Sequence, residues 1–485
     1  MIVLLLLSLL NISNHSGAST LEDAPNICLE RGACYQGAWK IYDDLRYASF
    51  QGIRYAQAPS GNLRFKPPVA YFDTEGVFDV SEDLEIGCPQ LYYYPTGQED
   101  CLLLNVYVPE QVFTRGKAND ETLPVMVWIH GGALMNGWNA FGSAGPNEFM
   151  RRDVIMVSIN YRLGAFGFLS LGNEDVPGNM GMRDQNMALR WVNQNIAKFG
   201  GNPQQITIFG ESAGALSVAY QVISPLSKGL FQRAIIQSGP AINPSWGRNS
   251  KEQANTYGNM LLQALNCEGT PNNGLDCLQS KSMDEVINAM FLNFNNPPSI
   301  WPDVLVWVPV PDSDYISDPF LPEDPETLLK TGQFNTDVDV IIGSNSDEGL
   351  LILMNAMTNS SLWEDYQKDF EIGGTKTLFA IAHNDDITAE DIENANKLLK
   401  SYVGSVEEID QSHGQNMIDM LTDSFFLFGT QKSIKYMQDQ GMNVYQYVLS
   451  YEYSQGSGFG VNHAEDTTYI FNPPFGVRPD CCQLR

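Results

Sequence analysis

A serine between two glycines, placed between an apolar run and a helix-like run, is the feature that most constrains this chain. The sequence GESAG occupies residues 210–214, with Ser212 at its centre. Residues 205–209 have the pattern of a buried strand, and residues 213–222 have the Ala, Leu and Val spacing of a helix packed against it. Glycines allow strained dihedrals in such a turn, so the serine oxygen stands exposed at the helix start. The pattern is typical of a nucleophile elbow, although an ordinary small-residue turn has the same composition.

The rest of the chain has the organisation of one large unit. It contains 485 residues, of which 43% are hydrophobic, and can bury a sizeable core. Strand-like and helix-like segments alternate without an internal repeat or a low-complexity spacer. We therefore expect an α/β fold: a large central, mostly parallel twisted sheet with helices on both faces and loop insertions.

The N-terminal residues indicate export. Residues 2–10 form an apolar run too short to cross a bilayer, and small residues at 16–18 follow it. We expect a signal peptide over residues 1–18, a single domain over residues 19–485, and a secreted, extracellular protein without a membrane anchor. The alternative is a buried N-terminal strand. Secretion would make the sequon at Asn359 usable for glycosylation.

The cysteines suit an oxidising compartment, where disulfides persist. Of the eight cysteines, Cys481 and Cys482 are adjacent and have no obvious partner. The others form three pairs that lie close along the chain, with connectivity open: Cys88 with Cys101, Cys267 with Cys277, and Cys28 with Cys34. The cysteine spacing and the small number of histidines do not match a zinc site, so we expect no metal and no cofactor.

The charge balance restricts the partners. Lys and Arg number 28 against 57 Asp and Glu, which gives a net charge of -29. This argues against nucleic acid and anionic membrane surfaces, and it mildly favours neutral or cationic small molecules. Acidity that only keeps a secreted protein soluble is an equally good explanation.

A second glycine-rich turn supplies candidate hydrogen-bond donors. Residues 125–129 have the pattern of a buried strand and lead directly into His130, Gly131, Gly132 and Ala133. Backbone amides aimed at a developing oxyanion stabilise a tetrahedral intermediate. We assign these donors to the amides of Gly132, Ala133 and Ala213, while a plain turn after a strand is the alternative.

An activated serine also needs a base and an acid. His463 is a candidate base because it follows an apolar strand at residues 444–449 and a glycine-rich loop at residues 456–460. Asp347 or Glu348 could be the acid, because both lie in a loop after the strand at residues 339–342. The order serine, acid, histidine is that of α/β-hydrolases.

Short segments spread along the chain carry a resemblance to a known family. From about residue 37 to residue 471 the chain resembles the type-B carboxylesterase and cholinesterase family. The segments that carry it are SFQGIRYA at residues 49–56, LRF at 63–65, EDCL at 99–102, NYR at 160–162, NMAL at 186–189, FGGNP at 199–203 and QSG at 237–239.

The resemblance implies roles that spacing leaves open. Ser212 would be the nucleophile, Glu348 rather than Asp347 the acid, and His463 the base. Further implied features are supports for the histidine from Ser238 and Asp466, disulfides Cys88–Cys101 and Cys267–Cys277, and buried ion pairs of Arg54 with Glu99 and of Arg162 with Asp184.

Departures from the family pattern bear on the substrate. The loop between Cys88 and Cys101 has tyrosines at residues 92–94 and lacks the tryptophan on which cholinesterases stack choline. Leu351 and Ile352 stand where cholinesterases carry aromatic residues, and Leu305 lies near the place of an acyl-pocket aromatic. A general carboxylesterase acting on small-molecule esters is therefore expected, with cholinesterase or lipase-like activity as alternatives.

The C-terminal residues differ most from the family. Residues 472–485 do not resemble the segment that relatives carry after the histidine. A truncated, inactive esterase and a catalytically silent binding protein of the neuroligin kind are the alternatives outside catalysis. The sequence leaves the oligomeric state open and is compatible with a monomer.

Overall fold

The computed structural model describes residues 24–471, with gaps at 73, 92–93, 115–121, 141–144, 244–245, 293–298, 303–304, 382–385 and 453–455. The predicted signal peptide, the tyrosines at 92 and 93, and the tail with Cys481 and Cys482 lie outside the described residues.

A nine-stranded sheet forms the centre of the molecule, in the order β14-β13-β12-β11-β9-β10-β8-β4-β3. Its strands are β3 (Ala38–Tyr42), β4 (Leu45–Arg54), β8 (Leu103–Pro109), β9 (Leu123–Ile129), β10 (Ile155–Ile159), β11 (Gly201–Glu211), β12 (Arg233–Gln237), β13 (Asp339–Asn345) and β14 (Val444–Leu449). The strands from β14 to β10 pair in parallel, and β8, β4 and β3 continue the sheet antiparallel. The predicted α/β fold with a mostly parallel central sheet is confirmed.

Two small sheets lie apart from the central one. The first joins β1 (Asn26–Cys28), β2 (Ala33–Gln36) and β5 (Gly76–Asp79), and the second pairs β6 (Gln90–Leu91) with β7 (Pro95–Thr96). The helices are α1 (Gln111–Thr114), α2 (Asn147–Met150), α3 (Gly164–Phe168), α4 (Met180–Asn195), α5 (Ala213–Ile223), α6 (Lys251–Ala264), α7 (Leu275–Ser280), α8 (Met283–Leu292), α9 (Pro325–Thr331), α10 (Leu350–Thr358), α11 (Leu362–Lys368), α12 (Thr375–Phe379), α13 (Ala389–Tyr402), α14 (Gly414–Thr422), α15 (Phe428–Asp439) and α16 (Thr467–Ile470).

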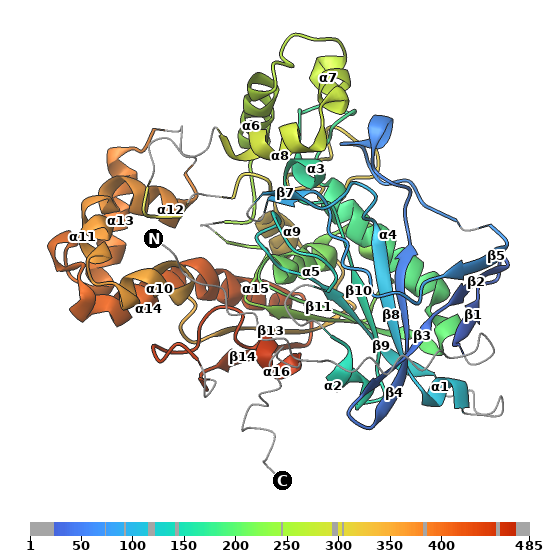
Figure 1. The fold of residues 1–485 in the computed structure, drawn as a ribbon. Helices are drawn as coiled ribbons and strands as arrows, with labels where there is room; N and C mark the ends of the chain where they lie inside the picture. The colour runs from blue at the N-terminus through green and yellow to red at the C-terminus, as the bar shows by residue number, and fades with distance from the viewer. Residues whose placement is uncertain are drawn as a thin grey trace, which may run out of the picture.

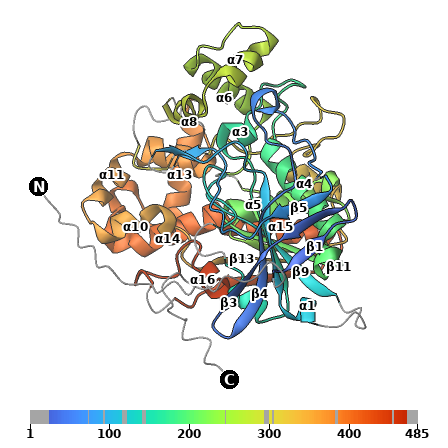
Figure 2. The same cartoon turned by 45° about the vertical axis from the view of Figure 1, so that its right-hand side comes forward.

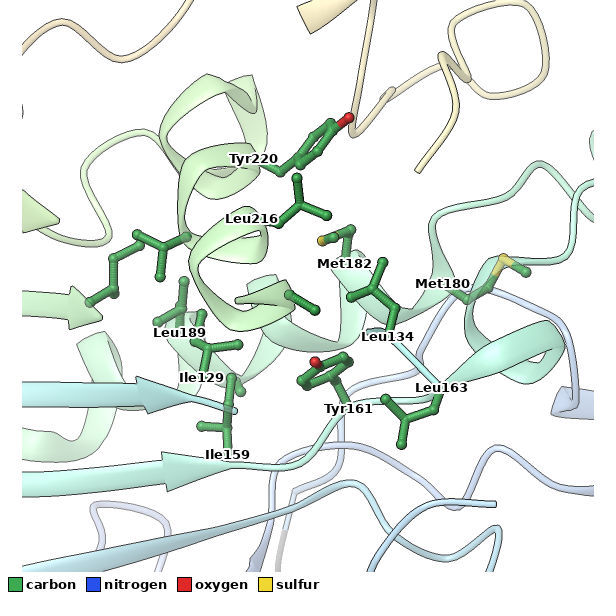
Figure 3. Close-up of a cluster of buried hydrophobic side chains, with 14 of the residues drawn as sticks. Ile129, Leu134, Ile159, Tyr161, Leu163, Met180, Met182, Leu189, Leu216 and Tyr220 are labelled. Carbon is green, nitrogen blue, oxygen red and sulfur yellow. The ribbon is translucent and has the colours of Figure 1, made fainter. Parts of the chain in front are cut away.

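Both faces of the central sheet are apolar, because side chains alternate along each strand. In β9, Val127 and Ile129 belong to the large cluster beneath α4 and α5, whereas Trp128 belongs to a cluster on the opposite face with Phe471. In Figure 1, α4 and α5 lie above the sheet, and α2 and α16 lie below it. Figure 3 shows Leu216 of α5 above the strand end that carries Ile129.

The chain between β13 and β14 forms a helical lobe beside the sheet. Helices α10 to α14, drawn in orange, gather on one side of the molecule in Figures 1 and 2. They bury a separate apolar cluster that includes Trp363, Phe370 and Phe426. Trp246, which follows β12, packs against both this cluster and the sheet core, so it lies where the two meet.

The described residues contain three disulfides, and these are the three pairs considered from the sequence: Cys28–Cys34, Cys88–Cys101 and Cys267–Cys277. In the part of the chain that the structure describes, none of the helices combines the length and the apolar character needed to cross a bilayer.

One of the two implied ion pairs is wrong. Arg162 pairs with Asp184 as expected, and its Nε lies 2.7 Å from Oδ2 of this fully buried carboxylate. Glu99, however, pairs with Arg64, whose Nε donates to it at 2.7 Å. Arg54 instead forms an ion pair with the neighbouring Asp100. The two acids are adjacent in the loop before β8, so their side chains point apart and meet different arginines.

Candidate active site

Ser212 occupies a strained turn between β11 and α5. Its φ of 58° and ψ of -125° lie in a region that L-residues rarely adopt. The turn is fixed by the Ser212 amide, which donates to the carbonyl of Gln237 at 2.9 Å. A Cβ on Gly214 would overlap the carbonyl oxygen of Ile129, so only glycine lets α5 begin this close to β9. The structure therefore has the elbow geometry that the sequence predicts.

His463 and Glu348 meet at the carboxyl ends of β13 and β14. The Nδ1 atom of His463 lies 2.5 Å from Oε2 of Glu348, which is fully buried. The other carboxylate oxygen, Oε1, accepts the amide of Asn345 at 2.8 Å and the hydroxyl of Ser238. These bonds fix the carboxylate, and the carboxylate anchors the imidazole through its Nδ1 atom.

Asp347, the other candidate acid, lies on a different side of the same loop. Its carboxylate accepts the amide of Val461 at 2.9 Å and the side-chain amide of Gln415 at 2.9 Å. It therefore pins the loop that carries His463, while Glu348 contacts the ring.

The other described histidines are structural or exposed. His130 is buried and stacks on Tyr161 with ring centroids 4.4 Å apart, and burial lowers the pKa of its imidazole to about 4. His413 pairs with Asp410 at 3.1 Å. His383 lies outside the described residues.

Glu211 is a neighbour of the histidine that the sequence reasoning did not assign. Its Oε1 lies 3.1 Å from Nε2 of His463, on the side of the ring opposite Glu348. Burial raises the pKa of the Glu211 carboxyl well above its usual range. Burial alone would lower the pKa of His463, but the carboxylates of Glu211 and Glu348 outweigh it and raise this pKa. The only signal in the sequence was that Glu211 precedes Ser212 in the elbow.

The two expected supports of His463, Ser238 and Asp466, differ in what they contact. Ser238 is in direct contact with Glu348, as described above. Asp466 is 6% exposed and accepts the side-chain amide of Gln237 at 2.9 Å and the hydroxyl of Tyr447 at 2.8 Å. Its charge helps to raise the pKa of His463.

The candidate oxyanion donors flank Ser212. Gly132 and Ala133 take positive φ values of 100° and 56°, and the Gly132 carbonyl accepts the amide of Asn136 at 3.0 Å. Ala213 is the first residue of α5, so its amide has no carbonyl partner within the helix. The N-terminal end of an eleven-residue helix also favours negative charge at this point.

A cavity of about 410 Å³ joins these groups. It is lined by Ala133, Ser212, Trp246, Ile300, Pro302, Leu305, Leu351, Ile352, Asn355, Tyr366, Thr377, Phe425, Phe426 and His463. No carboxylate is among these lining residues, and most of them are apolar. The described residues also contain no group of three or more His, Cys, Asp or Glu side chains that could hold a metal ion.

Comparison with known proteins identifies the family of this chain. The model of the Carboxylesterase family matches residues 31–481. The chain belongs to this family. The resemblance inferred from the sequence is thus confirmed, and the central sheet is that of the α/β-hydrolase fold.

Curated relatives support the same assignment. The chain is 37% identical to a carboxylic ester hydrolase of Bombus ignitus, over 97% of this chain and 83% of the relative. It is 32% identical to an acetylcholinesterase of Leptinotarsa decemlineata, over 88% of this chain and 71% of the relative. It is 34% identical to a juvenile hormone esterase of Tribolium castaneum, over 88% of this chain and 75% of the relative.

Proposed function

We propose that this member of the carboxylesterase family hydrolyses carboxylic esters through an acyl-enzyme on Ser212. One observation carries the proposal: the buried pair of Glu348 and His463 opens onto the same cavity as the serine of a strained elbow. Nucleophile, base and orienting carboxylate in this arrangement are the components of acyl transfer.

In the proposed mechanism, Nε2 of His463 takes the proton of the Ser212 hydroxyl as its oxygen attacks the ester carbonyl carbon. For this step the imidazole must turn its Nε2 atom away from Glu211 and toward the hydroxyl of Ser212. Glu348 stabilises the imidazolium that forms. The amides of Gly132, Ala133 and Ala213 would hold the oxyanion, each contributing about 3 to 4 kcal/mol in comparable enzymes.

The tetrahedral intermediate then collapses. The imidazolium returns the proton to the leaving alcohol, and the carbonyl re-forms as the acyl-enzyme. Water, deprotonated by the same histidine, attacks this ester. The imidazolium then returns its proton to the Ser212 oxygen as the bond to the acyl carbon breaks, and the carboxylic acid leaves. These steps use only groups of the chain, so the mechanism draws on no cofactor.

The cavity supports a neutral ester as the substrate. Leu305, Leu351 and Ile352 give it aliphatic walls, and no carboxylate among its lining residues would attract a quaternary ammonium. We expect kcat/KM for a neutral butyl ester to exceed that for the matched choline ester. The reverse order would favour a cholinesterase, and a preference for long acyl chains would favour a lipase-like enzyme.

Secretion is part of the proposal. Disulfides persist in oxidising compartments, and Asn359, the candidate glycosylation site, is exposed after α10. Expression in an exporting host and treatment with a glycosidase would test both points. Retention in the producing cells, or a mass unchanged by the glycosidase, would contradict them.

The activity is tested by labelling with an organophosphonate together with turnover of a nitrophenyl ester. We expect one label per chain, loss of label and turnover in Ser212→Ala, and retention of both in Ser217→Ala. Ser217 is a matched control, because its buried hydroxyl lies one turn along α5 and donates to the carbonyl of Ala213 at 2.8 Å. An unlabelled, inactive wild-type protein would instead favour a silent binding protein or an inactive esterase.

A further inference from the structure

A π-helical turn interrupts the helical lobe next to the candidate active site. It spans Asp423–Leu427, between α14 and α15. The carbonyl of Phe425 in this turn accepts two side-chain donors from the segment after β12: the amide of Asn243 and, at 3.0 Å, Nε1 of Trp246. Asn243 is 1% exposed, so its bond to the carbonyl is shielded from water.

The turn places an aromatic ring against the histidine. The rings of Phe426 and His463 have centroids 5.1 Å apart and planes inclined at 38°. The ring of Phe426 also lies 5.9 Å from that of Trp246, and its side chain is 2% exposed. Offset and tilted contacts at such separations are favourable for aromatic rings. His463 is therefore bound by Glu348 at Nδ1 and packs against the ring of Phe426.

The segment after β12 reaches the other catalytic candidates as well. Ser238, its first residue, donates to the carboxylate of Glu348. A Cβ on Gly239 would overlap the backbone oxygen of Ser212, so this segment passes directly behind the elbow.

A second close approach fixes the same segment against the helical lobe. A Cβ on Gly429, in the first turn of α15, would overlap the carbonyl oxygen of Ile242. The backbone of α15 and the backbone just before Asn243 therefore touch without an intervening side chain. This backbone contact fixes where the donors of Asn243 and Trp246 meet the π-helical turn.

π-Helical turns are uncommon, and they frequently lie at functional sites. Here the Phe425 carbonyl accepts two side-chain donors, and both come from one segment. Without those donors, a buried carbonyl would lose hydrogen bonds, and the turn would gain by relaxing toward a regular helix. Such relaxation would shift Phe426 around the helix and away from His463.

We propose that Phe426 is a positioning residue for His463, and that Asn243 and Trp246 hold it in place through the carbonyl of Phe425. The inference rests on the proposed function, since it concerns the base of that reaction. According to this inference, the segment after β12 aligns the histidine in two ways. Its Ser238 acts through Glu348, and its Asn243 and Trp246 act through the π-helical turn.

Two variants test the hydrogen bonds without removing a ring from the cavity. Asn243→Leu keeps the volume of the side chain and deletes the donor. Trp246→Phe keeps an aromatic wall and deletes the indole N–H. The control is Asn335→Leu, because Asn335 is also buried and donates to a backbone carbonyl, that of Ser224, at 2.9 Å.

The readouts are kcat per phosphonate-titrated site and KM for a nitrophenyl ester. Titration counts competent molecules, so a variant that merely unfolds in part keeps the wild-type kcat per site. We expect kcat per site to fall on the order of 10- to 100-fold in Asn243→Leu and Trp246→Phe, with KM little changed, because a small displacement of the base slows the chemical step. Asn335→Leu should retain the wild-type kcat per site.

A direct variant completes the test. Phe426→Leu should show the same fall in kcat per site even if Asn243→Leu does not fold. Wild-type kcat per site in both Trp246→Phe and Phe426→Leu would overturn the inference and leave the proposed function intact. An inactive, unlabelled wild-type protein would refute the proposed function itself, and the inference with it.

Discussion

The Nε2 atom of His463 lies 3.1 Å from Oε1 of Glu211, the residue that precedes Ser212. The imidazole thus lies between two carboxylates, because its Nδ1 faces Glu348 at 2.5 Å. Each carboxylate favours the imidazolium when it is ionised, whereas a general base must be neutral before it takes a proton. The structure therefore couples the charge of Glu211 to the pH at which the proposed base can act.

Replacing Glu211 by glutamine is expected to move the acid limb of the pH profile of kcat/KM to lower pH. Glu211 is the strongest of the charges that raise the pKa of His463, so its removal lowers that pKa. Activity is lost as pH falls through the pKa, and the limb should shift down by roughly 1 to 3 pH units. Glu364→Gln, at an exposed carboxylate paired with Lys368, should leave the limb in place. A limb that stays put in Glu211→Gln would show that Glu211 does not tune this histidine.

Loss of the Ser238 hydroxyl should lower activity more than stability. Ser238→Ala leaves Glu348 with the amide of Asn345, so the free energy of unfolding should fall by only about 1 kcal/mol. The less constrained carboxylate should lower kcat about tenfold, by analogy with other groups that orient a catalytic partner. Ser224→Ala removes an equally buried hydroxyl that donates to Phe320 at 2.7 Å, and it should leave kcat unchanged. Equal losses of kcat in both variants would count against a positioning role.

The elements that carry the site were predictable because local patterns determine them. The strands expected at residues 125–129, 205–209, 339–342 and 444–449 are the cores of β9, β11, β13 and β14. Each is a largely apolar run bounded by polar or glycine-rich sequence, although β14, at the edge of the sheet, is only partly buried. Their parallel order brings the ends that carry Ser212, Glu348 and His463 to one edge of the sheet.

Contacts that depend on side-chain direction were not predictable in the same way. Arg54 and Arg64 both lie near the acidic pair at residues 99–100, and only the backbone path decides that Glu99 meets Arg64. The π-helical turn that presents Phe426 has no marker in the sequence. It depends on donors from a distant segment, so tertiary contacts rather than propensity select it.

The ion pair of Arg162 with Asp184 should contribute strongly to stability. Asp184→Asn leaves a guanidinium that is 1% exposed without its countercharge. Breaking one side of such a buried pair costs about 3 to 5 kcal/mol. Denaturant unfolding should show this loss, whereas Glu393→Gln, in an exposed pair with Lys397, should leave the unfolding curve close to that of the wild type. Similar unfolding curves for the two variants would contradict the importance of burial.

Gly214→Ala should abolish turnover because it separates the elbow from β9. The added Cβ would overlap the carbonyl oxygen of Ile129 and lie 2.9 Å from the carbonyl carbon of His130, both of which are backbone atoms. The start of α5 must then move away from the turn after β9 that carries Gly132 and Ala133, and Ser212 moves with it. A displacement of this kind is enough to lower kcat by at least about 100-fold.

Gly441→Ala is the control, since a Cβ there meets nothing within 4 Å although its φ is +81°. It should carry only a backbone cost of about 1 kcal/mol and keep wild-type kcat. Wild-type kcat in Gly214→Ala, measured per titrated site, would show that the elbow tolerates a wider approach.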